Sequence, residues 1–281
     1  MAFSSWVAGH LTGGIGNRLF QHAAAAGLAE KWNRPLVFYL PECGPTNHGA
    51  FDNIFKLFPT VPQITNPVSV IRIPEAQGGV FTYSSFPSEP VAPFVSVDGW
   101  RQTERYFPSQ GMQADFHNAI SSQRRTELES QYNLSTQDDR LQTWFLHIRL
   151  GDYKMLPHHQ IDMASYYSQV SSHIPKGARI LLFSDELDRF GVGLQTELER
   201  FGISTTPISI PDELETLYIM SLCLGGAVVA NSTFSWWGAY FARRNHPSPS
   251  IYRAIYPALW GRGLPPAIDI VPSWGIRVQN Q

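Results

Sequence analysis

The fold is decided by the stretch Trp6-Val7-Ala8-Gly9-His10-Leu11-Thr12-Gly13-Gly14-Ile15-Gly16, in which a short apolar run enters a glycine turn. The run is typical of a strand, and apolar side chains then recur at helical spacing over residues 17–32. Asn33-Arg34-Pro35 ends this helix, and residues 36–40 form a second apolar run. Strand, helix and strand in this order predict an α/β fold with parallel strands.

The same alternation returns after an irregular middle. Residues 41–108 are rich in proline and predict loops with short strands such as 95–97, followed by a mixed polar helix over 105–131. Beyond them we expect strands at 144–150, 179–183, 206–210 and 227–230, and helices near 166–173, 194–200, 212–223 and 234–243. We therefore predict two Rossmann-like domains with parallel sheets, an N-terminal lobe over 1–130 and a C-terminal lobe over 131–281.

Composition supports a globular protein of two domains. The chain has 281 residues, and a domain holds about 150. Only 16% of its residues are charged, against about 25% in an average soluble protein, and 13% are aromatic. Low charge and many aromatics argue against disorder, and a net charge of −2 gives no electrostatic basis for nucleic-acid binding. Cys43 and Cys223 are far apart and predict neither a zinc site nor a redox pair.

The first motif is the glycine turn itself, continued as Asn17-Arg18-Leu19-Phe20-Gln21. Glycines between a strand and a helix let backbone N–H groups approach an anion. The spacing is not that of a dinucleotide-binding turn, and neither Tyr-x-x-x-Lys nor Gly-Lys-Ser/Thr occurs, so an NAD-dependent oxidoreductase and a P-loop enzyme have little support. A turn that only packs a helix on a sheet explains this motif equally well.

The second motif is His147-Ile148-Arg149-Leu150-Gly151-Asp152-Tyr153, at the carboxyl end of an expected strand, where α/β proteins bind ligands. Alternation places His147 and Arg149 on one face and the two apolar side chains on the other. A forked guanidinium suits a phosphate or pyrophosphate. Asp152 is a candidate base or ribose partner, and a purely structural ion pair with Arg149 remains the alternative.

Two further motifs follow later strands. In Phe183-Ser184-Asp185-Glu186, Asp185 can bind a nucleoside or simply cap the next turn. In 230–239, Ala-Asn-Ser-Thr-Phe-Ser-Trp-Trp-Gly-Ala, hydroxyl side chains and N–H groups at a helix start can cradle a pyrophosphate. We expect Trp236 and Trp237 to pack this helix into the core rather than to stack on a sugar.

Together, in this order, the four motifs resemble those of glycosyltransferase family eleven, whose best-known members are alpha-1,2-fucosyltransferases. The segment 98–107, Asp-Gly-Trp-Arg-Gln-Thr-Glu-Arg-Tyr-Phe, is also similar to a segment of that family. The resemblance covers roughly residues 10–240. It implies a GT-B architecture of two facing Rossmann-like lobes, GDP-fucose held mainly by the C-terminal lobe, acceptor binding on the N-terminal lobe, and no metal or other cofactor. The absence of an Asp-x-Asp motif agrees with the last point.

The resemblance also implies roles for particular residues. Arg149 holds the β-phosphate and neutralises the leaving GDP, and Asp152 is our first candidate for the base that takes the acceptor proton in an inverting transfer. The remaining implied binding residues are His147 and Asp185 at the nucleoside, Ser232, Thr233 and Phe234 at the pyrophosphate and base, and Asn17 with Gly14 and Gly16 at the donor sugar.

Two departures from the family pattern matter. Leu150 stands where the family has a second arginine, and alternation turns it away from Arg149. His22 stands where the family has tyrosine after Gln21, a change that we expect to affect acceptor preference.

We expect transfer to a hydroxyl, O2 of a galactoside, on an oligosaccharide or a lipid-linked glycan. The alternatives are a transferase for another GDP-deoxysugar such as colitose, and a non-catalytic GDP-sugar-binding module. No apolar run is long enough to span a bilayer, and the N-terminus resembles no signal peptide. We therefore expect a cytoplasmic enzyme, either free or peripheral at the inner membrane.

Overall fold

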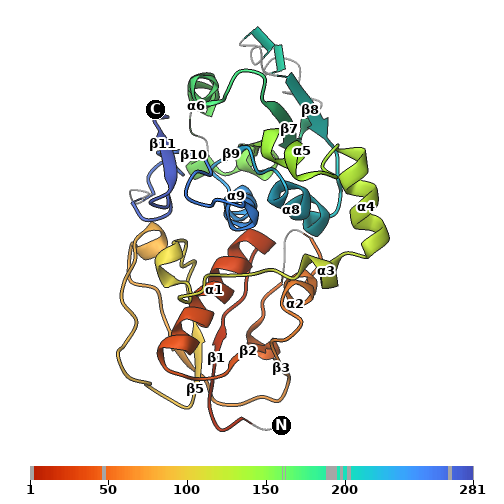
Figure 1. Cartoon of the computed structure of the whole chain (residues 1–281). Coiled ribbons are helices and arrows are strands. Elements are labelled where there is room, and N and C mark those ends of the chain that lie inside the picture. The colour runs from red at the N-terminus through yellow and green to blue at the C-terminus, as the bar shows by residue number, and fades with distance from the viewer. Residues whose placement is uncertain are drawn as a thin grey trace. The chain divides into compact units, whose positions relative to one another are not determined.

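Two compact units make up the chain in the computed structural model. Unit 1 comprises residues 1–119 and 265–272, and unit 2 comprises residues 120–264 and 273–281. The structure describes residues 3–45, 49–159, 161, 163–187, 195–196, 199–200, 204–264 and 268–280. Each unit contains one parallel sheet (Figure 1).

The sheet of unit 1 has the strand order β3-β2-β1-β5-β4. Its strands are β1 (Trp6–Gly9), β2 (Leu36–Tyr39), β3 (Gln63–Ile64), β4 (Ile71–Ile73) and β5 (Phe94–Val97), and every pairing is parallel. Helix α1 (Ile15–Lys31) connects β1 to β2 as the glycine turn predicts, and α2 (Asn53–Leu57) and α3 (Phe116–Ala119) are short. The irregular middle indeed contains short elements, β5 among them.

The two faces of this sheet carry separate apolar clusters because side chains alternate along β1. Val7 packs with alanines and Leu28 of α1, whereas Trp6 and Ala8 pack with residues of β2 on the other face. The small side chains of α1 permit close contacts. A Cβ atom added at Gly27 would lie 1.9 Å from the carbonyl oxygen of Tyr106, so this position requires glycine.

The sheet of unit 2 has the order β11-β10-β9-β6-β7-β8, again entirely parallel. Its strands are β6 (Thr143–Ile148), β7 (Arg179–Ser184), β8 (Ser204–Ile208), β9 (Gly226–Val228), β10 (Ala254–Pro257) and β11 (Gly275–Val278). Counted within the unit from β8, this is the order 3-2-1-4-5-6 of a Rossmann fold. The chain adds β7 and β8 on one side of β6 and then crosses back to add β9, β10 and β11 on the other side, so the order of the strands reverses between β6 and β9.

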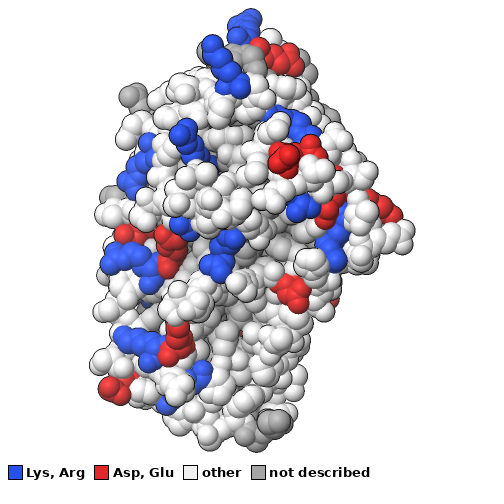
Figure 2. All heavy atoms as spheres, viewed as in Figure 1, with Lys and Arg blue, Asp and Glu red and all other residues white. Residues whose placement is uncertain are grey.

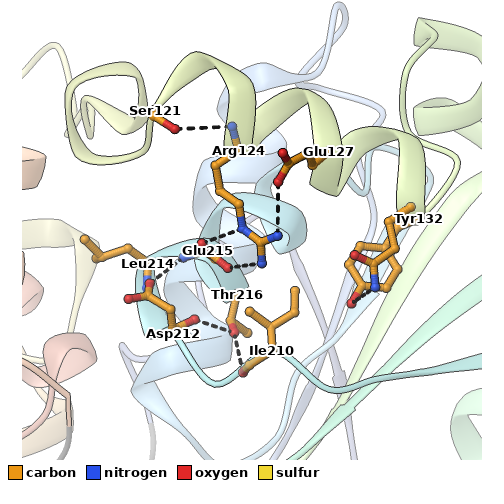
Figure 3. Close-up of polar contacts among 10 residues, drawn as sticks. Ser121, Arg124, Glu127, Tyr132, Ile210, Asp212, Leu214, Glu215 and Thr216 are labelled. Carbon is orange, nitrogen blue, oxygen red and sulfur yellow. Dashed lines mark hydrogen bonds and ion pairs between the residues drawn. The ribbon is translucent and has the colours of Figure 1, made fainter.

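Helices α4 (Ser122–Gln131), α5 (Gln137–Gln142), α6 (Met163–Val170), α8 (Glu213–Ser221) and α9 (Thr233–Asn245) belong to this unit. Figure 3 shows how Arg124 connects α4 to α8: its Nε and Nη2 each lie 2.8 Å from one carboxylate oxygen of Glu215. Asp212 caps α8 by accepting from the backbone N–H groups of Leu214 and Glu215 at 2.8 and 2.9 Å.

Three sequence predictions need correction. The mixed helix expected over 105–131 is a 3-10 turn (Glu104–Tyr106), then α3 and α4, because Pro108 and the N-capping Ser121 interrupt it. The strand expected over 144–150 ends at Ile148, and the strand expected over 206–210 runs from Ser204 to Ile208. The helix expected over 194–200 lies largely outside the described residues.

Charged side chains lie in small groups of both signs on the face shown in Figure 2, separated by uncharged surface. Among the described helices, none combines the length and the apolarity needed to span a membrane.

Candidate functional site

The candidate site of unit 2 lies where its chain reverses direction across the sheet. Strands β6 and β9 are parallel neighbours, so the segments that follow them leave the same edge of the sheet. These segments contain the second and the fourth sequence motif. Ligands of open α/β sheets bind at this point, outside the carboxyl ends of the strands. The topology therefore brings together two motifs about 80 residues apart in sequence.

Arg149 follows the last residue of β6 and is held by two carboxylates. Its Nη2 lies 2.6 Å from Oδ1 of Asp152, and its Nη1 lies 2.8 Å from Oδ2 of Asp185. The other oxygen of Asp185 accepts from the backbone N–H of Leu150 at 2.9 Å. Asp185 thus ties the segment after β7 to the segment after β6, and the guanidinium is held between two carboxylates.

The turn after β6 is fitted closely around Asp185. A Cβ atom at Gly151 would lie 2.3 Å from Oδ2 of Asp185, so the approach of this carboxylate requires glycine there. Lys154 and Glu186 form a second ion pair between the same two segments. Leu150 packs against the core cluster that contains Ile148, as alternation predicts for the position where the family has arginine.

His147 is a neutral group at this edge. Its residue is 6% exposed, and its backbone oxygen accepts from the hydroxyl of Tyr167 at 2.8 Å. Burial, reinforced by the positive charge of Arg149, lowers the pKa of His147 to about 3. The ring centroid of Phe234 lies 6.0 Å from that of His147, so two predicted nucleoside contacts are neighbours.

The fourth motif begins helix α9 at the same edge. Ser232 is its N-cap residue, with extended backbone and no side-chain capping hydrogen bond. The hydroxyl of Tyr153 donates to the carbonyl oxygen of Asn231 at 3.1 Å, which links the turn before α9 to the segment after β6. The N-terminal N–H groups of a helix of this length, together with its dipole, attract an anion. Trp236 and Trp237 are fully buried, which confirms their predicted packing role.

Unit 1 has a corresponding edge, where β1 and β5 are parallel neighbours. Gly13 adopts a left-handed φ of 77°, and Gly14 is the N-cap residue of α1. Oδ1 of Asn17 accepts from Nε2 of Gln102 at 3.1 Å, so the segments after β1 and β5 meet here. Gly16 lies buried within α1.

Sequence reasoning missed the residues that hold this turn. The buried Arg18 donates from Nε to the carbonyl oxygen of Gly13 and from Nη2 to that of Gly44, each at 2.8 Å. Oε1 of Gln21 accepts from the backbone N–H of Thr12 at 2.8 Å. Both side chains occur in the motif, and a charged or amide group on the buried face of a helix is the signal that could have identified them.

The expected influence of His22 on the acceptor is not direct. Its residue is 1% exposed, with ring centroids 4.7 Å from Phe38 and 4.5 Å from Phe58. This burial rules out contact between His22 and an acceptor. Burial also lowers the pKa of His22 to about 3.

Comparison with known proteins establishes the fold. No family model matches the chain, and no curated protein does. Among solved structures it is similar to NodZ alpha-1,6-fucosyltransferase co-crystallised with GDP, with TM-score 0.50, 12% identity, and coverage of 84% of this chain and 92% of that one. It is also similar to fucosyltransferase NodZ from Bradyrhizobium, with TM-score 0.50, 13% identity, and coverage of 88% and 94%. The fold is of the GT-B type. Its two parallel sheets are those that the sequence predicts.

Within the described part of the chain, no group of three or more His, Cys, Asp or Glu side chains is arranged to hold a metal ion.

Proposed function

We propose that this protein is an inverting glycosyltransferase that moves L-fucose from GDP-fucose to a hydroxyl of a glycan acceptor. The observation that carries the proposal is the position of Arg149, which is paired with Asp152 and Asp185 after β6, at the edge of the sheet from which the segment leading into α9 also leaves. A guanidinium and the N–H groups of a helix start at one edge of a sheet suit a diphosphate. The order of the four motifs and the likeness to NodZ support GDP-fucose as the donor.

The donor then occupies the edge of unit 2. Arg149, Ser232 and Thr233 bind the diphosphate, and His147, Asp185 and Phe234 contact the nucleoside. Neutral His147 places no charge against the base. The family resemblance assigns Asn17, Gly14 and Gly16 of unit 1 to the fucose. As the bond from the anomeric carbon to the phosphate oxygen breaks, Arg149 and the helix stabilise the negative charge that develops on GDP.

Asp152 is the proposed base. Its Oδ1 lies 2.6 Å from Nη2 of Arg149. A bound diphosphate contacts the same guanidinium, and the Asp152 carboxylate accepts the proton of the acceptor hydroxyl. Arg149 thus holds the leaving group and the base at one place, and transfer needs no metal ion.

The family resemblance favours O2 of a β-galactoside as the acceptor atom, on an oligosaccharide or a lipid-linked glycan. The NodZ neighbour is an alpha-1,6-fucosyltransferase, so the linkage must be determined on the product.

The test is incubation with GDP-fucose and a panel of β-galactosides, with and without EDTA, followed by product mass and linkage analysis. We expect the mass gain of one fucose, an alpha-1,2 linkage and no effect of EDTA. An alpha-1,6 product would overturn the linkage alone. Turnover of GDP-colitose but not GDP-fucose would replace the donor, and GDP binding without turnover of either would make the protein a binding module.

A further inference from the structure

An exposed tryptophan lies at the carboxyl edge of the sheet of unit 1. Trp100 follows β5 by three residues and is 40% exposed, although the other large aromatic side chains of this unit mostly fill its core. A single exposed apolar residue is common on protein surfaces and is not by itself evidence of a binding site. The backbone around Trp100 is what sets this residue apart.

Two left-handed residues flank Trp100. Gly99 has φ 100° and Arg101 has φ 52°, a conformation that is uncommon for a residue other than glycine. Both oxygens of the Glu75 carboxylate hold this turn: Oε2 accepts from the N–H of Trp100 at 2.9 Å and Oε1 from that of Arg101 at 2.8 Å. A Cβ atom at Gly99 would lie 2.3 Å from Cβ of Glu75, so this clamp requires glycine.

The buried side chain of Arg101 holds the turn through hydrogen bonds. It is 1% exposed and donates to the carbonyl oxygens of Asp98 at 2.9 Å and Ile73 at 3.0 Å. Its guanidinium also lies over the rings of Phe86 and Tyr106, 5.1 and 5.3 Å from their centroids. A left-handed residue persists only where its surroundings fix it, and such residues concentrate at ligand sites. Buried interactions therefore hold an exposed indole in one place.

An amide side chain lies near the indole. A Cβ atom at Gly13 would lie 3.6 Å from Cζ3 of Trp100 and 3.0 Å from Nδ2 of Asn17, so indole and amide flank the same glycine. Asn17 is itself hydrogen-bonded to Gln102. A flat apolar ring beside amide groups matches a pyranose, whose C–H face packs on the ring while its hydroxyl groups bond to amides.

We infer that Trp100 is the platform on which a neutral sugar of the acceptor stacks, and that Glu75 is a positioning residue for it. This inference rests on the proposed function, because it assigns the acceptor to the edge of unit 1.

Steady-state kinetics with GDP-fucose and methyl β-galactoside test the platform. Trp100→Ala should raise the KM for the galactoside at least tenfold, whereas the KM for GDP-fucose should change little. Trp100→Phe should retain most of the affinity, since a flat ring remains, and Trp100→Leu should not. Glu75→Gln should raise the galactoside KM severalfold, with kcat nearly unchanged. The control is Val91→Ala, which alters another exposed apolar side chain of unit 1.

Direct binding separates this inference from the proposed function. Saturation-transfer NMR with methyl β-galactoside alone should show the sugar on the wild type and on Val91→Ala, but not on Trp100→Ala. If the wild type transfers no fucose yet shows this pattern, the proposed function fails and the platform stands. If transfer is normal and Trp100→Ala, Trp100→Leu and Trp100→Phe all keep the wild-type galactoside KM, the platform is overturned. A rise in the KM for GDP-fucose instead would assign the ring to the donor and overturn the acceptor assignment.

Discussion

The carboxyl edges of the two sheets are built alike but carry different chemistry. In each unit, neighbouring parallel strands end where the chain reverses direction, and a helix starts after a strand there. The edge of unit 2 carries Arg149 between two carboxylates. The edge of unit 1 carries glycines, amides and an exposed indole. The proposed roles, a diphosphate at one edge and a sugar of the acceptor at the other, therefore rest on these side chains and not on the fold.

The strongest test of this contrast removes the charge from one edge. Arg149→Ala should lower kcat by roughly 10²–10³-fold, the loss typical of removing one preorganised charge-stabilising donor. Steady-state transfer assays measure this loss, and a thermal melt checks that the variant folds.

The matched control is Arg124→Ala. Arg124 also binds carboxylates, Glu215 above all, but it does so between helices α4 and α8 (Figure 3). Its removal should leave kcat within about twofold, because it does not contact the donor edge. Equal loss of activity in both variants would show that Arg149 acts through the stability of unit 2.

The next largest effect is expected from Asp152→Asn. The amide keeps an oxygen for Arg149 but is a poor base, so kcat should fall about 100-fold, a typical contribution of general base catalysis, while GDP binding persists. Calorimetric titration with GDP and single-turnover transfer separate the two steps. A kcat near that of the wild type would reduce Asp152 to an ion-pair partner.

A smaller change at the same edge is Arg149→Lys. Lysine retains the charge but cannot bond two groups with a planar fork, so it should recover only part of the activity, about tenfold below the wild type. The same transfer assay measures it. Full recovery would mean that charge alone is required there.

The stability of the core of unit 1 should depend on pH. Because burial lowers the pKa of His22 from 6.5 to about 3, the unfolded state binds the proton more readily, and stability falls as pH falls below 6.5. For this one group the loss between pH 8 and pH 5 is on the order of 2 kcal/mol.

His22→Phe keeps the ring packing against Phe38 and removes the titration. Urea unfolding at pH 8 and pH 5 should therefore give a smaller difference in the variant than in the wild type. His147 remains in both proteins and also contributes to acid sensitivity, so the variant should lose only part of it. An unchanged difference would show that His22 is not the proton acceptor.

Sequence patterns located both edges but not the contacts that shape them. Glycine turns and polar residues after apolar runs predicted where β1, β6, β7 and β9 end to within two residues. The strand order did not follow, because β10 (Ala254–Pro257) and β11 (Gly275–Val278) were not predicted. The hydrogen bonds that Asp185 and Glu75 accept could not be predicted either, because the backbone N–H groups that donate them are 35 and 25 residues away in sequence. Such pairings arise from tertiary structure and leave no periodic signal.

Asp269 lies late in the chain but binds residues of unit 1 that are synthesised much earlier. Oδ2 of Asp269 accepts from the backbone N–H of Tyr83 at 2.7 Å, its own N–H donates to the carbonyl oxygen of Phe81 at 2.9 Å, and its carboxylate pairs with Arg105. These contacts belong to unit 1, although most of unit 2 precedes Asp269 in the chain. During synthesis the ribosome therefore releases the first unit with this position vacant, and that unit is completed only after nearly all of the second has emerged.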